Sequence, residues 1–217
     1  MAFKVVDVTT TSKETASEID LFSDLTLDRD TKKQIQQDVG EFLVEKILES
    51  VSSRTSPIAG GTYKKTLSPE YKKHKQAEGG SSVADLKLTG IMLDELGFKK
   101  TEDGILLGVF GDAAPRADGH SNLSGESTLP ERKFLPNIDE EFKSSIQSGV
   151  ERIIADAIAD SVDLDRSDFE GVDSTDDLYE VLSDEMPDMT RAEIRAAIYR
   201  NEALTELLES LGLLDDL

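Results

Sequence analysis

The sequence predicts an α+β fold, in which two long amphipathic helices pack on a small, mainly antiparallel sheet and an acidic helical appendage follows at the C-terminus. Apolar residues recur at spacings of three and four over two long segments, which is typical of helices that bury one face. Between these segments, two β-prone runs flank an Asp-Gly turn, which indicates a hairpin. Two such helices around short strands predict helices layered on a sheet.

The first long helix is predicted over residues 30–53. Gly40 weakens this helix by roughly 1 kcal/mol relative to Ala, and we expect the glycine to permit close packing. The helix is expected to end before Pro57, because a proline ring disfavours helical geometry in the preceding residue. The predicted apolar face consists of Ile35, Val39, Phe42, Leu43, Ile47, Leu48 and Val51.

A loop and a short basic helix are predicted next. Proline, paired glycines and threonine over residues 56–66 indicate an exposed, adaptable loop. Ser68 then supplies an N-cap and Pro69 the first helical position, so a helix should run to about Ala77. The run Gly-Gly-Ser-Ser at 79–82 is expected to end it.

The predicted hairpin follows another short helix. That helix is expected over residues 89–96, with Gly97 as its breaker. The strands are expected over 98–101 and 105–110, separated by Glu-Asp-Gly at 102–104.

A long loop and the second long helix complete the predicted core. Residues 111–128 are rich in Gly, Ala, Ser and Asp and predict a long mobile loop of the kind that a partner often orders. A short strand is predicted over 133–135 and a helix over about 138–159. The apolar face of that helix is expected to comprise Phe142, Ile146, Val150, Ile153, Ala157 and Ile158.

Three short helices are predicted after an acidic linker. Ser174 could cap a helix to about Glu185, the capping-box spacing of Thr190 and Glu193 starts a helix through Tyr199, and 203–211 supplies a third. At about 45 residues, a bundle of these helices would be marginal alone, so we expect it to dock on the main domain or on a neighbouring subunit. The residues expected to face inward are Leu178, Leu182, Ile194, Ile198, Leu204, Leu207 and Leu208.

Length and composition suggest a four-part organisation of the 217 residues. The predicted parts are an N-terminal arm (1–26), a core domain (27–160), an acidic linker (161–173) and a small acidic three-helix bundle (174–217). The chain has no secretory signal and no run of about 18 apolar residues, so we expect no membrane association.

Charge is unevenly distributed along the chain. There are 45 acidic and 24 basic residues, and residues 161–217 hold 17 of the acids but only four of the bases. Between residues 54 and 75 the sign reverses, with six bases against the single acid Glu70. Oppositely charged regions can orient a molecule in an assembly, whereas the simpler reading is that the acidic excess serves solubility.

No catalytic or cofactor-binding pattern is present in the sequence. The chain lacks cysteine, and neither His74 nor His120 has a second ligand at metal-site spacing, so both are expected to be surface residues. Phosphate-cradling loops, nucleophile elbows and His-Glu-x-x-His helices are also missing. The sequence therefore predicts no enzyme, no cofactor and no metal site.

The basic segment, with its interleaved tyrosines, is the predicted partner-binding region. Contact with an acidic protein surface, contact with DNA and a merely solvated helix face all remain open, although an acidic chain argues against a general nucleic-acid binder. The candidate partner-binding residues are Arg54, Tyr63, Lys64, Lys65, Tyr71, Lys72, Lys73, Lys75, Arg132 and Phe134.

Several short motifs follow one another in a characteristic order. They are Ser56-Pro57, then Leu-Ser-Pro-Glu-Tyr-Lys at 67–72, Leu-Thr-Gly-Ile-Met at 88–92 and Arg-Lys-Phe-Leu at 132–135, set between the two long helices. In this order, residues 27–159 resemble the virion-morphogenesis family of tailed phages, whose small proteins complete the tail or form the neck. Pro136, the N-terminal extension and the acidic C-terminal bundle depart from the family pattern.

The resemblance implies a structural neck or tail-completion protein, located in the virion and in the host cytoplasm during assembly. Its implied partners are other phage neck or tail proteins and further copies of itself in a ring, through which DNA passes without sequence-specific binding. Acidic walls would keep the genome from adhering to such a ring. The alternatives are an acidic regulatory or DNA-mimic protein and a transient assembly chaperone.

Overall fold

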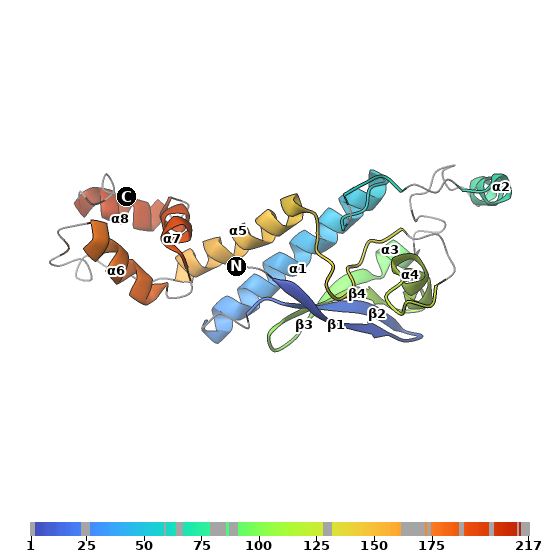
Figure 1. Cartoon of the computed structure of the whole chain (residues 1–217), viewed down its shortest axis with the longest axis horizontal. Helices are drawn as coiled ribbons and strands as arrows, with labels where there is room; N and C mark the ends of the chain where they lie inside the picture. Colours follow the sequence, from blue (N-terminus) through green and yellow to red (C-terminus); the bar gives the residue numbers. More distant parts are fainter. Residues whose placement is uncertain are drawn as a thin grey trace. The chain divides into compact units, whose positions relative to one another are not determined.

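The computed structural model shows a mixed α+β protein with a four-stranded antiparallel sheet and eight helices in the part of the chain that it describes (Figure 1). The chain divides into two compact units, residues 1–23 with 36–150 and residues 24–35 with 151–217. The described residues are 3–22, 27–58, 60–63, 67–78, 86, 91–127, 132–161, 172, 175–186, 189–199, 202–211 and 213.

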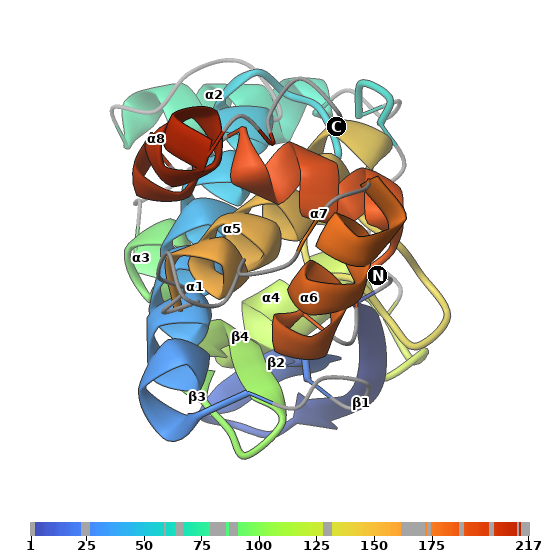
Figure 2. The same ribbon diagram turned by 90° about the vertical axis from the view of Figure 1, so that its left-hand side faces the viewer.

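The sheet has the strand order β1-β2-β4-β3, and every neighbouring pair is antiparallel (Figure 2). Its strands are β1 (Lys4–Thr10), β2 (Glu14–Asp20), β3 (Leu96–Lys100) and β4 (Gly104–Phe110). The predicted hairpin of β3 and β4 is confirmed. Sequence analysis predicted neither β1 nor β2, which form a hairpin of their own and place β2 in the interior of the sheet.

One face of the sheet is apolar and buried. Ile105, Leu107 and Val109 of β4 share this face and are fully buried, as is Ile19, the partner of Ile105 on β2. Polar side chains on this face form hydrogen bonds with backbone carbonyls from distant parts of the chain. The hydroxyl of Thr15, for example, donates to the Ala114 carbonyl at 2.7 Å. Segments that follow β4 in the chain therefore contact this face.

Helix α1 (Arg29–Ser52) confirms the first predicted long helix. Asp28 accepts hydrogen bonds from the backbone N–H groups of Asp30 and Thr31 at 2.8 and 3.0 Å, which satisfies donors that would otherwise lack partners at the helix start. A hydrogen bond from the Thr31 hydroxyl, together with these two backbone bonds, lowers the pKa of the Asp28 carboxyl.

Within the first unit, α1 lies against the sheet (Figures 1 and 2). The side-chain amide of Gln36 donates to the carbonyls of Thr101 and Gly104, both at 2.7 Å, and so ties the helix to the β3–β4 turn. A Cβ atom at Gly40 would overlap the ring of Phe98 on β3. The glycine therefore permits the close approach that its position in an amphipathic helix suggested.

The prediction of a long loop over residues 111–128 is wrong. Residues Ala114–Ser121 form helix α4, with a proline in its first turn and Asn122 at its C-cap with φ +57°. Ala114, Ala117 and Ser121 are buried at spacings of three and four. Small side chains build this buried face, so the composition resembled that of a loop although the spacing is helical.

The predicted strand over residues 133–135 is also absent from this segment. The N–H groups of Phe134 and Leu135 lie 3.4 and 3.2 Å from the Ser121 hydroxyl oxygen, and the N–H of Arg132 donates to the His120 carbonyl at 3.0 Å. The segment is thus bonded to the end of α4 and has no strand neighbour among the described residues.

Two helix boundaries differ from the prediction. Helix α3 (Ile91–Asp94) is shorter than expected, because Leu96 and Gly97 belong to β3 and pair with Val109 and Gly108. Helix α5 (Ser144–Ser161) begins later than predicted, since Asp139 has φ +63° and the N–H of Glu140 closes a turn on the Asn137 carbonyl. Ile154, rather than the predicted Ile153, is buried on α5.

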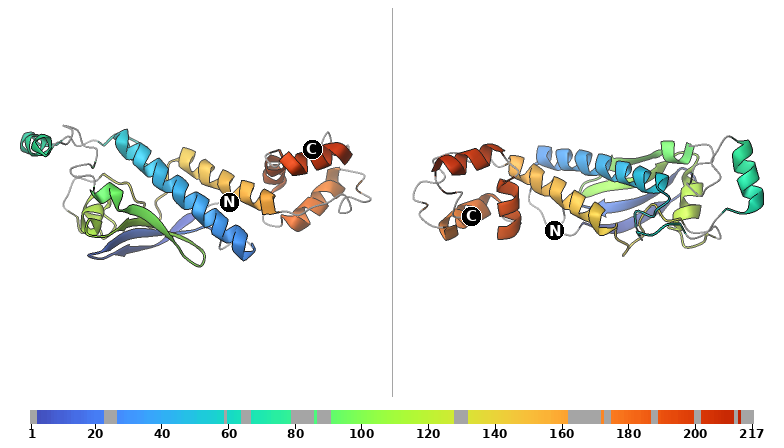
Figure 3. Two further views of the ribbon diagram at one scale, coloured as in Figure 1. Left: turned by 180° about the vertical axis from the view of Figure 1, so that it is seen from behind. Right: turned by 90° about the horizontal axis from the view of Figure 1, so that it is seen from above.

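The second unit contains the three predicted C-terminal helices, shown in orange and red in Figure 3. They are α6 (Thr175–Glu185), α7 (Arg191–Ile198) and α8 (Glu202–Leu211). The predicted capping box is present, with the Thr190 side chain accepting from the Glu193 N–H and the Glu193 carboxylate accepting from the Thr190 N–H. Of the residues expected to face inward, all are buried except Leu207, which is half-buried. Most of the predicted acidic linker, 162–171 and 173, lies outside the described residues.

Candidate partner-binding site

Helix α2 (Pro69–Ala77) forms as its sequence predicts. Ser68 has extended backbone angles and its hydroxyl accepts a hydrogen bond from the Tyr71 N–H at 3.2 Å, while proline stands in the first turn. Both features favour a helix start, because the hydroxyl satisfies an orphan donor and proline lacks one. The run of basic residues is therefore held in a helix with a defined first turn.

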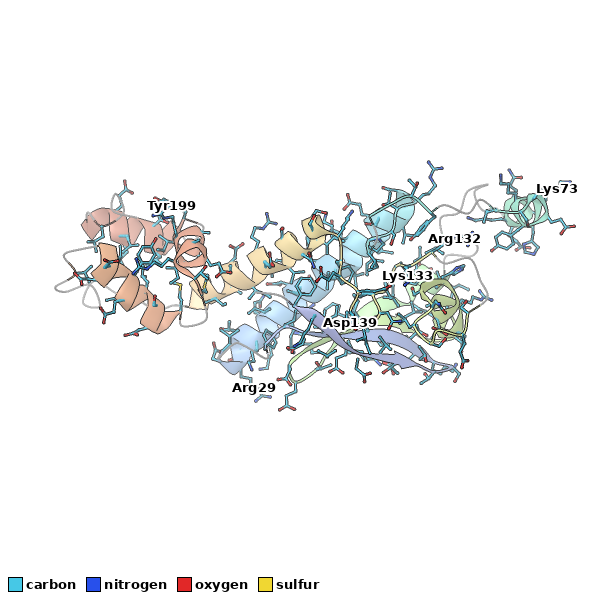
Figure 4. All side chains as sticks on the ribbon, in the orientation of Figure 1. Arg29, Lys73, Arg132, Lys133, Asp139 and Tyr199 are labelled. Atoms are coloured by element: carbon cyan, nitrogen blue, oxygen red, sulfur yellow. The ribbon has the colours of Figure 1, made fainter. Side chains whose placement is uncertain are left out.

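The exposed surface of α2 combines aromatic rings with positive charge. Tyr71 is 43% exposed, and its ring is nearly parallel to that of His74, with 6.3 Å between the centroids. Lys73 is exposed and projects from the helix, as Figure 4 shows, and Lys72 is half-buried. Lys75, by contrast, has only 2% of its surface exposed. Of the four residues predicted on this helix, Tyr71, Lys72 and Lys73 are therefore accessible to a partner, and Lys75 is not.

Two other predicted residues, Arg54 and Tyr63, lie at the turn that follows α1. Arg54 adopts φ +60°, and its carbonyl accepts a hydrogen bond from the Tyr63 N–H at 3.0 Å. An isolated bridge between Thr55 and Thr62 continues this pairing. The turn therefore brings Arg54 and Tyr63 side by side, whereas the predicted Lys64 and Lys65 lie outside the described residues.

Hydrogen bonds join this turn to the segment that carries Arg132. The Ser56 hydroxyl donates to the Lys133 carbonyl at 2.8 Å, and the Lys143 N–H donates to the Pro57 carbonyl at 2.9 Å. These bonds join residues that are far apart in the sequence. They hold the turn, the segment after α4 and the start of α5 in one arrangement.

The two predicted residues of that segment have different environments. Phe134 is fully buried, so it packs in the core and is not presented to a partner. Arg132 is 7% exposed. Its neighbour Lys133 forms an ion pair with Glu140, whose other carboxylate oxygen accepts from the Asn137 N–H at 3.0 Å.

Two buried donors of this region, one on each segment, lack a hydrogen-bond partner among the described residues. The Nε atom of Arg132 and the hydroxyl of Tyr63 are both shielded from solvent, and neither has a hydrogen-bond partner among the residues that the structure describes. Burial raises the pKa of Tyr63 well above its usual value, and the positive charge of Arg132 acts in the opposite direction.

Sequence analysis missed the residues that hold the turn after α1 and the Arg132 segment together. Ser56, Ser121 and Glu140 fix the turn and the segment after α4 through hydrogen bonds and an ion pair. No periodicity or spacing marks them, since each acts on a residue from another part of the chain. The Ser-Pro pair was recognised as a turn signal, but not as an anchor for a segment 77 positions away.

Comparison of the chain with protein-family models, with curated proteins and with solved structures finds no match. Across the described ranges, no group of three or more His, Cys, Asp or Glu side chains is placed to hold a metal ion. Within the same ranges, every helix is too short or too polar to cross a membrane.

Proposed function

We propose that this chain is a structural protein of a tailed-phage virion, of the neck or tail-completion type, which joins head and tail through protein–protein contacts in a ring-like assembly. The observation that supports this proposal most is the basic, aromatic surface of α2 in a chain with a net charge of −21. Such a surface is complementary to an acidic neighbour, and complementary charge sets orientation and register in assemblies.

Protein is the proposed partner of α2 because the rest of the chain repels nucleic acid. A DNA-binding domain is usually basic overall, whereas this chain has 45 acidic and 24 basic residues. In a ring around a DNA path, the acidic surfaces would line the path and keep the genome mobile. The basic helix would then face another subunit or a connector protein.

We further propose that the finer architecture serves this assembly. The two long helices, α1 and α5, pack on the sheet to form the core domain, and helices α6 to α8 form an acidic appendage to it. The appendage would dock on partners particular to its own virion, in the host cytoplasm during assembly and in the finished neck or tail.

Reversing the charge of α2 tests the proposal. The variant Lys72→Glu/Lys73→Glu keeps the cap and the buried Lys75, so we expect it to fold, as measured by circular dichroism. We expect it to be missing from purified particles, as measured by mass spectrometry. The control Lys4→Glu/Lys100→Glu makes the same charge change at two exposed lysines of the sheet and should be incorporated normally.

The same particles distinguish the alternatives. A wild-type chain that is required for particle formation but absent from finished particles would identify a transient chaperone. Absence from particles with tight one-to-one binding to a host protein would identify an acidic regulator or DNA mimic. Either result would reject the proposed structural role.

A further inference from the structure

Helices cover only one face of the sheet in the part of the first unit that the structure describes (Figure 1). Both α1 and α4 lie against the buried face, as the close approach at Gly40 and the bond from Thr15 show. Successive residues of a strand point to opposite faces. Glu18 therefore lies on the uncovered side, because its neighbour Ile19 is fully buried. We call this side the open face.

The open face holds two carboxylates of like charge at directly opposed positions. Asp7 on β1 and Glu18 on β2 are register partners, and the next lysine along β1, Lys4, is opposite a third acid, Asp20. Neither Asp7 nor Glu18 forms an ion pair within the described ranges, and the Asp7 carboxylate accepts a hydrogen bond from the Val8 N–H at 2.8 Å. Like charges directly opposite each other destabilise a pair of strands. A cation from outside the chain would relieve this repulsion.

Apolar side chains lie next to this acidic pair. Leu106 of β4 is the other register partner of Glu18 and is half-buried. Val6, the extra residue in the bulge of β1, is 43% exposed. Lys99, which follows Leu106 in the same row of the sheet, is bonded to Glu14 at 2.8 Å. A partner that fits this surface needs positive charge for the two carboxylates and an apolar or aromatic group beside it.

The exposed surface of α2 has this composition. Lys72 and Lys73 supply two positive charges, and neither lysine forms an ion pair with a residue that the structure describes. Tyr71, which is 43% exposed, supplies an aromatic ring on the same short helix. Aromatic residues are enriched in the buried centres of protein interfaces. The chain therefore carries both halves of a complementary contact, one on α2 and one on the open face.

We propose that α2 of one copy of this chain docks on the open face of the next copy, with Lys72 and Lys73 at the Asp7–Glu18 pair and Tyr71 at Leu106. The two surfaces differ, so the contact is head-to-tail and closes a ring where the rotation between copies permits. The net charge of −21 does not prevent it, because exposed charges more than about 8 Å apart are largely screened at physiological ionic strength. This inference rests on the self-assembly that the proposed function includes.

The first test removes the two charges of the open face. In Asp7→Asn/Glu18→Gln, both side chains keep their size and lose their charge. Sedimentation velocity of the full chain over a range of concentrations should show that the dissociation constant for self-association rises by at least about 10-fold, because the lysines of α2 lose their charged partners. The control Glu41→Gln/Glu45→Gln makes the same change in net charge at two exposed positions of α1 and should change the constant by less than about 2-fold.

The thermal midpoint of the monomer gives the second readout. Measured below the dissociation constant, the midpoint of Asp7→Asn/Glu18→Gln should equal or exceed that of the wild type, because the substitutions remove a repulsion between β1 and β2. A purely structural role for the two acids would lower the midpoint instead. Weaker association together with an unchanged or higher midpoint therefore distinguishes a docking surface from a stabilising pair.

Mixing two reversed chains tests whether the two surfaces are partners. Lys72→Glu/Lys73→Glu and Asp7→Lys/Glu18→Lys should each stay monomeric at concentrations at which the wild type associates. An equimolar mixture should associate, because each kind of chain keeps one native surface and the two reversed surfaces are again complementary. The chain lacks cysteine, so a short bismaleimide should also join an Asp7→Cys chain to a Lys73→Cys chain, and should join neither chain to a further copy of itself.

Four outcomes would overturn the inference. They are a wild-type chain that stays monomeric, an Asp7→Asn/Glu18→Gln chain that associates normally, a loss of monomer stability in that variant that accounts for its loss of association, and a mixture of the two reversed chains that stays monomeric. The two proposals fail separately. A chain that self-associates through these surfaces but is absent from virions refutes only the virion role. A virion component that needs Lys72 and Lys73 for incorporation but not Asp7 and Glu18 refutes only this docking, since α2 would then bind a different protein.

Discussion

Replacing Gly40 with Ala is expected to destabilise the protein, although alanine is the better helix former. The exchange should stabilise α1 by about 1 kcal/mol through helix propensity alone. The added Cβ, however, would overlap three ring atoms of Phe98. Overpacking of this kind costs about 1 to 3 kcal/mol, so we expect a net loss of about 1 kcal/mol and no more than about 2 kcal/mol.

Urea unfolding followed by far-ultraviolet circular dichroism measures this loss as a lower midpoint at unchanged slope. A double-mutant cycle with Phe98→Ala isolates the steric part, because removing the ring removes the overlap. In the Phe98→Ala background, Gly40→Ala should raise stability by about 1 kcal/mol, which is the propensity contribution. A Gly40→Ala protein at least as stable as the wild type would refute the close approach of α1 to β3.

Two further predictions concern hydrogen bonds at the ends of elements. Gln36→Glu replaces a donor with a charged acceptor beside the two carbonyls of the β3–β4 turn, so it should lower the urea midpoint at pH 7. The midpoint should recover as the pH falls and the new carboxyl is protonated. The control Gln34→Glu, at an exposed position, should neither lower the midpoint nor make it depend on pH in this way. Thr190→Ala should cost about 1 kcal/mol by removing the cap of α7. The side-chain and backbone bonds from Thr190 lower the pKa of Glu193, so the stability that this carboxylate contributes is present above its usual pKa and is lost as the pH falls through the lowered value. Because alanine keeps the backbone bond but not the hydroxyl bond, this pH-dependent contribution should be smaller in Thr190→Ala.

Elements with a local signal were predictable from the sequence. The periodic apolar face of α1, the proline and serine that begin α2, the capping box of α7 and the Asp-Gly turn between β3 and β4 each act within a few residues. Such signals can be recognised without knowledge of the rest of the fold. The boundaries of these elements accordingly agree with the structure to within a few residues.

The strands β1 and β2 lacked such a signal for a physical reason. Positions of β2 that face the buried side of the sheet include Thr15 and Ser17, whose hydroxyls donate to the carbonyls of Ala114 and Pro136. Because distant acceptors satisfy these polar side chains, the strand needs few apolar residues and shows no clear alternation. A bulge between Val5 and Asp7 interrupts the pattern of β1 as well.

The candidate site was predictable only in part for the same reason. The helical run of Tyr71, Lys72 and Lys73 follows from local capping, and the structure leaves it accessible. Burial of Lys75 and Phe134 depends on packing that no spacing reveals. The turn that carries Tyr63 is likewise joined to the segment that carries Arg132 by the bond between the Ser56 hydroxyl and the Lys133 carbonyl, which composition does not reveal.

The interior position of β2 has a consequence for how the chain is made. Residues 14–20 leave the ribosome well before residues 104–110, which form the second of the two strands that they pair with. At 5 to 20 residues per second, the first hairpin waits about 5 to 20 s for that neighbour. During this interval one edge of β2 is open, and its charged side chains, Glu14, Glu18 and Asp20, discourage pairing between nascent chains on the same messenger. The pace of translation thus sets how long this protein is exposed to mispairing before its sheet can close.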